Sequence, residues 1–383
     1  MKRIDIQERP DWREKAKEDG FGFHTMYGDP YWQDDAAYVF TLEEIEQHIE
    51  EPTTQLHEMC LATAERVLES DERMKRLAIP DSMIDLVRAS WNNGDRHLYG
   101  RFDLAYDGTG PAKMLEYNAD TPTSIFEAAY FQHNWMVDQV EAGRLPEGTD
   151  QYNFLQESLI EALSFYPKDR IFHFACWTEN EEDLGTVAYL MDCATQAGHT
   201  TKVVDIRKIG VDANGRYTDE DDITIDQCFK LYPWEDMLRE DYAKHLAPGV
   251  FVEPIWKSMI SNKGFLAQLW EMNKGHPNLL ETAVQSEIQS FSSSGYVLKP
   301  FFSREGANIV IVQDGKIVEA TEGEYEEGPA IVQERAKLFM QNNRHAILGS
   351  WVIGDRACGL GIREDSGLIT KDMSRFIPHV IID

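Results

Sequence analysis

The sequence is poor in positive charge. It has 37 Lys and Arg against 67 Asp and Glu in 383 residues, a formal net charge of −30. Proteins that hold a phosphate backbone or an anionic membrane surface need clustered cationic side chains. We therefore expect no nucleic-acid partner and no membrane partner, whereas a cationic small molecule is compatible with this charge.

The sequence also has few cysteines and no long apolar run, and both features bear on the cellular compartment of the protein. The chain has five cysteines, an odd number, and no Cys-x-x-Cys pair, which argues against a disulfide framework and against a zinc site built on cysteine. No apolar run approaches the length of a membrane span, and the N-terminal stretch MKRIDIQERPDWREK lacks the apolar centre of a signal peptide. These observations predict a soluble, cytoplasmic protein with reduced thiols.

The usual motifs of nucleophilic hydrolysis are also missing. The sequence contains no Gly-x-Ser-x-Gly elbow, no catalytic-cysteine signature and no His-Glu-x-x-His. Apolar residues make up 42% of the chain, enough for packed cores, and the length favours two or three lobes. The chemistry is therefore expected to depend on polar side chains that the fold brings together.

A β-hairpin is predicted within residues 99–127. Gly100–Ala105 and Met114–Tyr117 alternate polar and apolar residues, and a Gly-rich turn at 107–110 lies between them. Because residues two apart on a strand share a face, Arg101 and Asp103 point the same way. Glu116 and Asn118 do the same on the second strand.

This hairpin carries a candidate metal site. Folding brings Asp103, Glu116 and Asn118 together, and two carboxylates with an amide oxygen suit a hard cation such as Mg²⁺. Arg101 beside them can hold a phosphate or a carboxylate in a bidentate fork. An ordinary hairpin with acidic residues on its solvent face is the alternative reading.

The patterning divides the chain into three regions, 1–165, 166–248 and 249–383. The first is mainly helical, with a capping box at Thr41 and Glu44, and it includes the hairpin. The second reads strand, helix, strand, as in an open parallel α/β sheet. The third is rich in antiparallel strands, so the fold class is a mixture of α+β and α/β.

The segments expected in the second and third regions can be given by their bounds. The second has strands Arg170–Cys176, Thr201–Ile206 and Cys228–Tyr232, and helices Thr178–Gly198 and Trp234–Leu246. The third has the helix Asn262–Asn273 and strands at Tyr296–Phe301, Ala307–Gln313, Lys316–Ala320, Ala330–Glu334, Ile347–Ile353 and Cys358–Arg363.

A second candidate site lies in Gly295–Asn308, GYVLKPFFSREGAN. Lys299 ends a predicted strand, and a glycine-containing loop leads to the next strand. Such a loop can cover nucleotide phosphates, with Lys299 as a point charge and the amides near Glu305 and Gly306 as donors. The segment is not a Walker A loop, and a plain β-hairpin is the alternative.

Four single residues are weaker candidates. Lys263, at the start of the helix 262–273, is either a second phosphate cation or a solvated lysine. Arg363 ends a strand, where it either stabilises developing negative charge or is an ordinary surface arginine. Glu181 and Glu182 lie in the first turn of a helix, and the helix dipole alone explains them unless a cationic ligand binds there.

Several blocks taken together resemble the glutathionylspermidine synthase family. In the family's order they are RFD at 101–103, EYNAD at 116–120, EPIWK at 253–257, SNK at 261–263, LKP at 298–300, REGAN at 304–308 and GIR at 361–363. The resemblance implies an ATP-grasp fold with permuted segments, in which the metal hairpin precedes the ATP-holding lysines. It also implies that residues 166–248 form an open α/β, pre-ATP-grasp, substrate-side domain and that residues 249–383 hold the nucleotide.

The resemblance implies a role for each matching position. Asp103, Glu116 and Asn118 would hold Mg²⁺, with two ions expected, and Arg101 and Arg363 would be catalytic. ATP would contact Lys263, Lys299, Glu305, Gly306, Gln333, Glu334, Arg335, Ala336, Leu368, Ile369 and Thr370. Arg101, Thr121, Thr123 and Glu182 would bind a thiol peptide, and Glu181 a polyamine.

The substrate half departs from the family pattern. The amidase domain of bifunctional members is not expected here. Thr121 and Thr123 stand where the family has serines, Arg375 lies near the place of a peptide-contacting aspartate, and Leu231–Glu235 lacks the expected threonines.

These observations favour an ATP- and Mg²⁺-dependent carboxylate–amine ligase that forms an amide through an acyl phosphate. Its small-molecule substrates are glutathione and spermidine if the resemblance extends to them. The departures in the substrate half leave open a ligase with another acid and another amine. A non-catalytic ATP-binding regulator is the third hypothesis, and the intact catalytic half argues against it.

Overall fold

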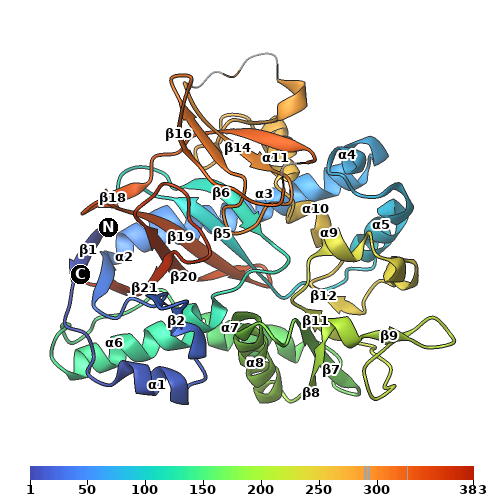
Figure 1. The fold of residues 1–383 in the computed structure, drawn as a ribbon, viewed down its shortest axis with the longest axis horizontal. Coiled ribbons are helices and arrows are strands. Elements are labelled where there is room, and N and C mark those ends of the chain that lie inside the picture. Colours follow the sequence, from blue (N-terminus) through green and yellow to red (C-terminus); the bar gives the residue numbers. More distant parts are fainter. Residues whose placement is uncertain (289–290, 292–293, 326) are drawn as a thin grey trace.

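The computed structural model describes residues 1–288, 291, 294–325 and 327–383. Its largest sheet joins the predicted hairpin to strands from the end of the chain (Figure 1). The strand order is β21-β20-β19-β5-β6, and β18 pairs separately with β19. The bounds are Tyr99–Ala105 for β5, Lys113–Asn118 for β6, Phe339–Gln341 for β18, Arg344–Ile353 for β19, Arg356–Asp365 for β20 and Arg375–Ile377 for β21.

The hairpin prediction is confirmed in its strands and in its register. Arg101 lies opposite Asn118 and Asp103 lies opposite Glu116, so all four polar side chains share one face of the sheet. A bulge at Leu115 shifts the register beyond Asp103. The apolar residues of the other face pack inward, where the rings of Phe102 and Tyr117 stack with centroids 3.8 Å apart.

A five-stranded antiparallel sheet lies beside the first sheet, at the top of Figure 1. Its order is β13-β17-β14-β15-β16, which confirms the antiparallel character predicted for the C-terminal region. The bounds are Thr282–Val284 for β13, Gly295–Pro300 for β14, Val310–Gln313 for β15, Lys316–Ala320 for β16 and Ala330–Glu334 for β17.

The predicted parallel unit is also confirmed. β7 (Ile171–Cys176) pairs in parallel with β8 (Thr200–Asp205) on one side and with β11 (Cys228–Lys230) on the other. β12 (Phe251–Val252) extends the sheet beyond β11. Helix α8 (Glu181–Gln196) connects β7 to β8 and places its N-terminus at the carboxyl end of the strands, where ligands bind in open α/β sheets.

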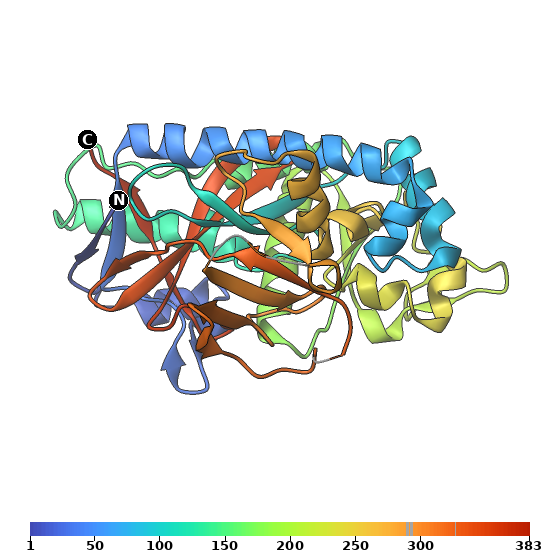
Figure 2. The same ribbon diagram turned by 90° about the horizontal axis from the view of Figure 1, so that it is seen from above.

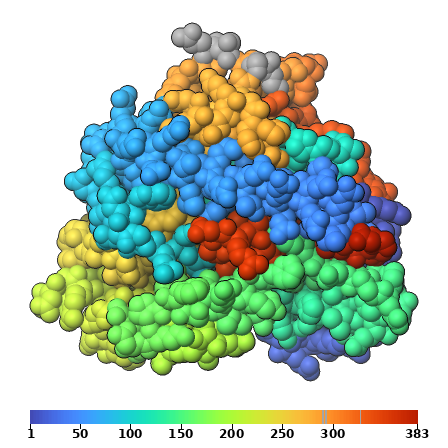
Figure 3. Space-filling view, turned by 180° about the vertical axis from the view of Figure 1, so that it is seen from behind, coloured from blue at the N-terminus to red at the C-terminus, as the bar shows by residue number. Residues whose placement is uncertain are grey.

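Helix α3 (Glu51–Leu68) crosses the back of the molecule, as Figures 2 and 3 show, and contacts β19 and β20. The capping box at Thr41 is present on α2 (Leu42–Ile45), and a π-helical turn, Glu46–Glu50, connects α2 to α3. The remaining helices are α1 (Trp12–Glu18), α4 (Asp71–Arg76), α5 (Ile84–Asn92), α6 (Gln132–Glu141), α7 (Leu155–Ser164), α9 (Trp234–Met237), α10 (Lys257–Ile260) and α11 (Gly264–Met272).

A small sheet joins the two ends of the chain. β4 (Ala36–Phe40) lies between β1 (Lys2–Asp5) and β22 (His379–Ile381). Two short pairs complete the strands, β2 (Thr25–Met26) with β3 (Asp29–Pro30) and β9 (Gly210–Val211) with β10 (Tyr217–Thr218). Among the described residues no helix is both long and apolar enough to cross a membrane.

Two predicted segments are wrong in their extent. The helix expected over 234–246 is broken, because α9 ends at Met237 and a separate 3-10 turn covers Asp241–His245. Within this turn the Tyr242 carbonyl accepts from the Tyr217 hydroxyl at 2.8 Å, a contact that local propensity does not predict. The strand expected from Ala307 begins only at Val310, because Asn308 has a left-handed backbone with φ of 53°.

Candidate active site

A cavity of about 550 Å³ opens where the two large sheets meet the parallel unit. Its lining comes from β5, β6, β14, β17 and β20, from the start of α8, and from the loops at 303–306 and 368–372. The sequence-predicted site residues line this one cavity, with the exception of Glu181. Residues that are far apart in the chain are thereby brought to a common space.

The hairpin places its polar side chains at the floor of the cavity. Asn118 Nδ2 donates to Asp103 Oδ2 at 3.1 Å and to Glu116 Oε1 at 3.4 Å. Both carboxylates also face cations, since Arg101 Nε lies 2.7 Å from Asp103 Oδ1 and Lys263 Nζ lies 3.1 Å from Glu116 Oε2. The arrangement concentrates hard oxygen atoms within reach of cationic side chains.

Lys263 and Lys299 meet above Glu116 from different elements. Lys263 precedes α11, and its Nζ also donates to the Ser303 carbonyl at 2.5 Å. Lys299 lies on β14 and donates to Gln333 Oε1 at 2.8 Å and to the Leu115 carbonyl at 3.0 Å. Burial would raise the pKa of Glu116, but the two lysines outweigh it and hold that pKa well below its ordinary value.

The pKa of Lys299 is strongly affected by its surroundings. Burial lowers the pKa of its ammonium group to about 8, although the negative charge of Glu116 acts in the opposite direction. The neighbouring positive charge of Lys263 adds to the lowering. An anion placed between the two lysines would therefore be bound strongly, because it relieves their mutual repulsion.

Arg101 is held in an extended position along the sheet. Its Nη1 donates to the Thr123 carbonyl at 2.9 Å, and its guanidinium carbon lies 5.6 Å from the centre of the Trp351 ring. Position 349 on the neighbouring strand is glycine, and a Cβ there would lie only 2.7 Å from Arg101 Cδ. Gly349 thus provides the room in which Arg101 lies.

The loop after β14 covers one side of the cavity. Glu305, with φ of 51°, and Gly306, with φ of 70°, have left-handed backbones. A Cβ at Gly306 would lie 2.3 Å from the Thr370 carbonyl oxygen, so only glycine allows this approach of the two loops. Arg304, which precedes them, donates to Thr121 Oγ1 and to Glu235 Oε1, each at 2.6 Å.

An apolar wall lies beside the lysines. Ile309, Ile311 and Ile369 form a small buried cluster against which Val297 and Leu368 pack. All five side chains line the cavity, as do residues 333–336 at the end of β17. The end of the cavity that holds the lysines is therefore bordered by an apolar wall and by the last residues of β17.

The opposite end of the cavity is acidic. Glu182 and Asp183 line it from the first turn of α8, whose N-cap Asn180 accepts from both of their backbone amides. Burial, with the nearby charges of Glu182 and Glu305, raises the pKa of Asp183 to about 7. Glu181 lies on the exposed side of this turn, near Gly22, and not in the cavity lining.

Arg363 is placed by the loop that follows its strand. Its Nε donates to the Ser374 carbonyl at 2.9 Å, and its Nη2 donates to the carbonyls of Lys371 and Asp372. The guanidinium carbon lies 5.0 Å from the centre of the Tyr31 ring. Arg363 therefore enters the cavity as a fixed cation near the acidic end.

Two of the sequence blocks that resemble the family, EPIWK at 253–257 and the end of EYNAD at 116–120, support the site through residues that do not line the cavity. Buried Glu253 accepts the amides of Leu98 and Tyr99 at the start of β5, and Lys257 Nζ lies 2.6 Å from it. Asp120 accepts from Lys230 Nζ and from the Trp234 amide, which ties the exit of the hairpin to the parallel unit. These buried ion pairs fix where the hairpin begins and ends.

Sequence reasoning missed several residues of the cavity. It explained the acids of the α8 first turn by the helix dipole, so it did not select Asp183, and it read Arg304 only as part of a matching block. Outside the cavity lining, nothing in the sequence marked Glu127 either. This buried carboxyl accepts from the Tyr31 hydroxyl at 2.7 Å, and burial together with Glu182 raises its pKa to about 7.

Comparisons with known proteins place the chain among relatives. The family model described as glutathionylspermidine synthase preATP-grasp matches residues 3–382. A Haemophilus influenzae protein named "Putative acid--amine ligase" is 36% identical, and the match covers 100% of both chains. Trypanothione synthetase of Crithidia fasciculata is 28% identical over 83% of this chain, which spans only 52% of that longer protein.

A solved structure shares the fold. It is that of a glutathione synthetase-like effector, GSS30, from Globodera pallida in its apo form. Its TM-score is 0.56 at 11% identity, and the match covers 98% of this chain and 99% of that one. At this identity the likeness shows a common mixed α/β fold.

The fold, the cavity and these relatives define an ATP-dependent ligase that forms a carbon–nitrogen bond. The chain belongs to the glutathionylspermidine synthase family.

Proposed function

We propose that this ligase has a permuted ATP-grasp fold and joins the carboxylate of an acid or peptide to a cationic amine through an acyl phosphate. The observation that most supports this function is the arrangement of charge in the cavity. Glu116, Lys263 and Lys299 converge at one end, and Glu182 and Asp183 lie at the other. The end with the lysines suits a nucleoside triphosphate with its metal, and the acidic end suits an ammonium group.

The hairpin residues fit Mg²⁺ by their donor set. Asp103 and Glu116 offer carboxylate oxygens, and Asn118, already within hydrogen-bond distance of both, offers an amide oxygen after a half-turn of its amide. We propose these three as ligands for two ions. Bound there, Mg²⁺ would neutralise the phosphate charge that develops during transfer.

The nucleotide is proposed to lie along the junction of the two large sheets. Lys263 and Lys299 would contact its phosphates, and Glu305 and Gly306 would lie above them. The apolar wall with Ile311 would take the base, which the strand end 333–336 and the loop 368–370 would flank. In this division residues 249–383 supply most nucleotide contacts, and residues 1–165 supply the metal hairpin.

The carboxylate substrate would lie between Arg101 and Arg363. A carboxylate oxygen attacks the γ-phosphorus, the bond to ADP breaks, and an acyl phosphate forms. The amine nitrogen then attacks the acyl carbon and phosphate leaves. Arg101 and Arg363 are fixed in advance by backbone carbonyls, so they can stabilise the anionic tetrahedral intermediate without reorganising.

The amine is proposed to enter at the acidic end, within the α/β region 166–248. Its ammonium group must lose a proton before it attacks, and Asp183, with a pKa raised to about 7, is poised to accept one. Arg304 bridges Thr121 to Glu235 and holds the covering loop, which limits access of water to the acyl phosphate.

Glutathione and spermidine are one proposed substrate pair, with Thr121, Thr123 and Glu182 on the peptide and Glu181 near the distal end of the polyamine. A different acid and amine form the second candidate pair. The second pair is favoured because the Thr121 hydroxyl and the Glu235 carboxylate are already bonded to Arg304 and are therefore not free to bind a peptide.

A substrate panel tests the proposal. Phosphate release and amide product are measured for each combination of glutathione, glutamylcysteine and simple amino acids with spermidine, putrescine and a neutral primary amine. The proposal requires ATP turnover that depends on both an acid and an amine, with cationic amines preferred. ATP binding without turnover on any pair would contradict ligase chemistry. It would favour the alternative hypothesis of a non-catalytic ATP-binding regulator.

A further inference from the structure

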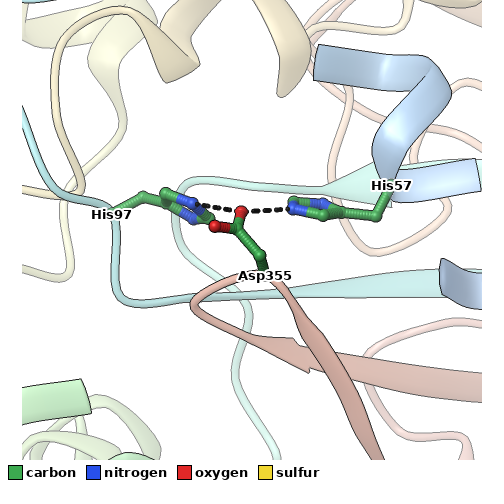
Figure 4. A group of neighbouring side chains, drawn as sticks. All are labelled: His57, His97 and Asp355. Atoms are coloured by element: carbon green, nitrogen blue, oxygen red, sulfur yellow. Dashed lines mark hydrogen bonds and ion pairs between the residues drawn. The ribbon is translucent and has the colours of Figure 1, made fainter. Parts of the chain in front are cut away.

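Three side chains from distant parts of the chain meet in one cluster (Figure 4). The cluster lies on the side of the β5–β6 hairpin opposite the cavity, because His57 contacts Tyr117, which alternates with the cavity residues Glu116 and Asn118. His57 comes from α3, His97 from the segment before β5, and Asp355 from the turn between β19 and β20. Asp355 Oδ1 lies 3.0 Å from His57 Nε2 and 3.1 Å from His97 Nε2. The three ligand atoms lie within 4.8 Å of one another.

We propose that His57, His97 and Asp355 form a binding site for a divalent transition metal of the Zn²⁺ class. Two imidazole nitrogens and one carboxylate oxygen are a donor set that zinc takes in proteins, with a fourth position left to water. Ligands about 2.0–2.2 Å from a tetrahedral zinc lie about 3.3 Å from each other. The two carboxylate–imidazole distances are already close to that separation.

The burial of the three side chains allows a metal to enter from solvent. His57 is 2% exposed and His97 is 13% exposed, so both rings are held by packing. Asp355 is 73% exposed and closes the site from the solvent side. A metal would therefore reach two fixed nitrogens past one exposed side chain.

The second nitrogen of each ring permits metal binding at Nε2. His57 Nδ1 lies 3.2 Å from the Tyr117 hydroxyl, which can donate to it or accept from it. His97 Nδ1 is buried and has no hydrogen-bond partner among the described residues, so with a metal at Nε2 its N–H lacks an acceptor, a cost that the metal–nitrogen bond has to offset. When either Nε2 atom exchanges its proton for a metal, its hydrogen bond to Asp355 Oδ1 is replaced by a metal ion shared with that carboxylate.

One positive charge, that of Lys257, acts on His97. The nearest buried cation, Lys257, is paired with Glu253 at 2.6 Å. The Trp256 ring packs edge-on against His97 at 5.5 Å between centroids and adds no charge. Asp355 supplies one negative charge to a dication at this position.

A metal here would act on the hairpin from behind. His57 contacts Tyr117, whose neighbours Glu116 and Asn118 point into the cavity, so the site would fasten α3 and the β19–β20 turn to the back of the hairpin. A ligand that binds only the folded chain stabilises it by mass action. The expected effect is stabilisation of the fold together with a fixed hairpin.

The test uses the full chain with excess Mg²⁺, so that the hairpin carboxylates do not compete for the added metal. Zn²⁺ and Co²⁺ are titrated into the wild type, into Asp355→Asn, and into Asp314→Asn as the matched control. Asp314 is likewise exposed, in the turn between β15 and β16, and lies apart from both sites. Metal stoichiometry, the Co²⁺ visible spectrum and the melting temperature are measured.

We expect one Zn²⁺ per wild-type chain, a four-coordinate Co²⁺ spectrum, and a melting temperature that rises with Zn²⁺. Asp355→Asn should lower the affinity at least tenfold and abolish the rise, whereas Asp314→Asn should match the wild type. Equal binding in all three proteins, or no binding in the wild type, would overturn the site and leave the cluster as a hydrogen-bonded clamp. An anomalous map of Zn²⁺-soaked crystals with the ion elsewhere would overturn it as well.

Discussion

Lys263 Nζ lies 3.1 Å from Glu116 Oε2, so the proposed phosphate cation and the proposed metal ligand are each other's partners in the free protein. Binding of a metal–nucleotide complex would separate this pair and give each group a partner of opposite charge. The ion pair thus keeps both charges compensated within the cavity until the nucleotide arrives.

The first prediction concerns Glu116. Glu116→Gln removes one metal-binding charge while it keeps the size of the side chain, so ATP turnover should fall by roughly two orders of magnitude. Phosphate release measures this, with Glu58→Gln on the exposed side of α3 as the control. Wild-type turnover in Glu116→Gln would contradict the ligand assignment.

The second prediction concerns pH and Lys299. Its lowered pKa of about 8 means that the free protein loses this charge as the pH rises through that value. Bound phosphate favours the charged form, so nucleotide affinity should be full below about pH 8 and fall above it. Lys299→Arg should remove the fall, because arginine keeps its charge in this range.

The measurement is the Kd of a nonhydrolysable ATP analogue between about pH 7 and about pH 9.5, a range that spans the pKa of a perturbed lysine. Lys299→Ala should weaken binding by roughly tenfold or more, the value of one charge-assisted contact of about 1.5–3 kcal/mol. A flat pH profile together with an unchanged Kd in Lys299→Ala would remove Lys299 from the phosphate site.

The third prediction concerns proton release on amine binding. The raised pKa of Asp183, about 7, leaves it partly protonated near neutrality, and a bound ammonium group favours the ionised form. Binding of a cationic amine should therefore release a proton near pH 7, and affinity should rise with pH through that region. Calorimetry in buffers of different ionisation enthalpy counts the proton.

Two variants separate the acids of the α8 first turn. Asp183→Asn should abolish the proton release and raise the KM of the cationic amine several-fold, with little change for ATP. Glu181→Gln should raise the amine KM less, because Glu181 lies outside the cavity lining. Both readouts should persist at moderate salt, since a diffuse field is screened within about 8 Å.

The fourth prediction concerns coupling of the two half-reactions. Arg304→Ala removes both 2.6 Å contacts that hold the covering loop to Thr121 and Glu235. Water should then reach the acyl phosphate, and the ratio of phosphate released to amide formed should rise several-fold above unity. A ratio that stays at the wild-type value would show that this bridge does not exclude water.

Local patterns predicted the parts of the fold that depend on short-range rules. The β5–β6 hairpin follows from period-two alternation and a glycine-containing turn. The capping box at Thr41 follows from the four residues Thr41–Glu44. The small sheet of β1, β4 and β22 joins the two ends of the chain, and no local sequence pattern predicts that pairing. The separate 3-10 turn Asp241–His245 likewise accepts a hydrogen bond from Tyr217, a residue that is remote in sequence.

The candidate site divides in the same way. The hairpin register alone predicted that Asp103, Glu116 and Asn118 would meet, whereas the family resemblance was needed to bring Lys263 and Lys299 to them. Their roles stay predictions. The cluster of His57, His97 and Asp355 could not have been found, since Asp355 is 298 positions from His57 and 258 from His97, with no motif to link them.

The pairing of β5 with β19 has a consequence for synthesis of the protein. Residues 99–105 leave the ribosome early, but their partner, residues 344–353, follows only after most of the chain. Until then the growing polypeptide has an open, apolar sheet edge, which is a template for aggregation. We therefore expect the nascent chain to depend on chaperone protection and to gain nucleotide turnover only after its last strands emerge.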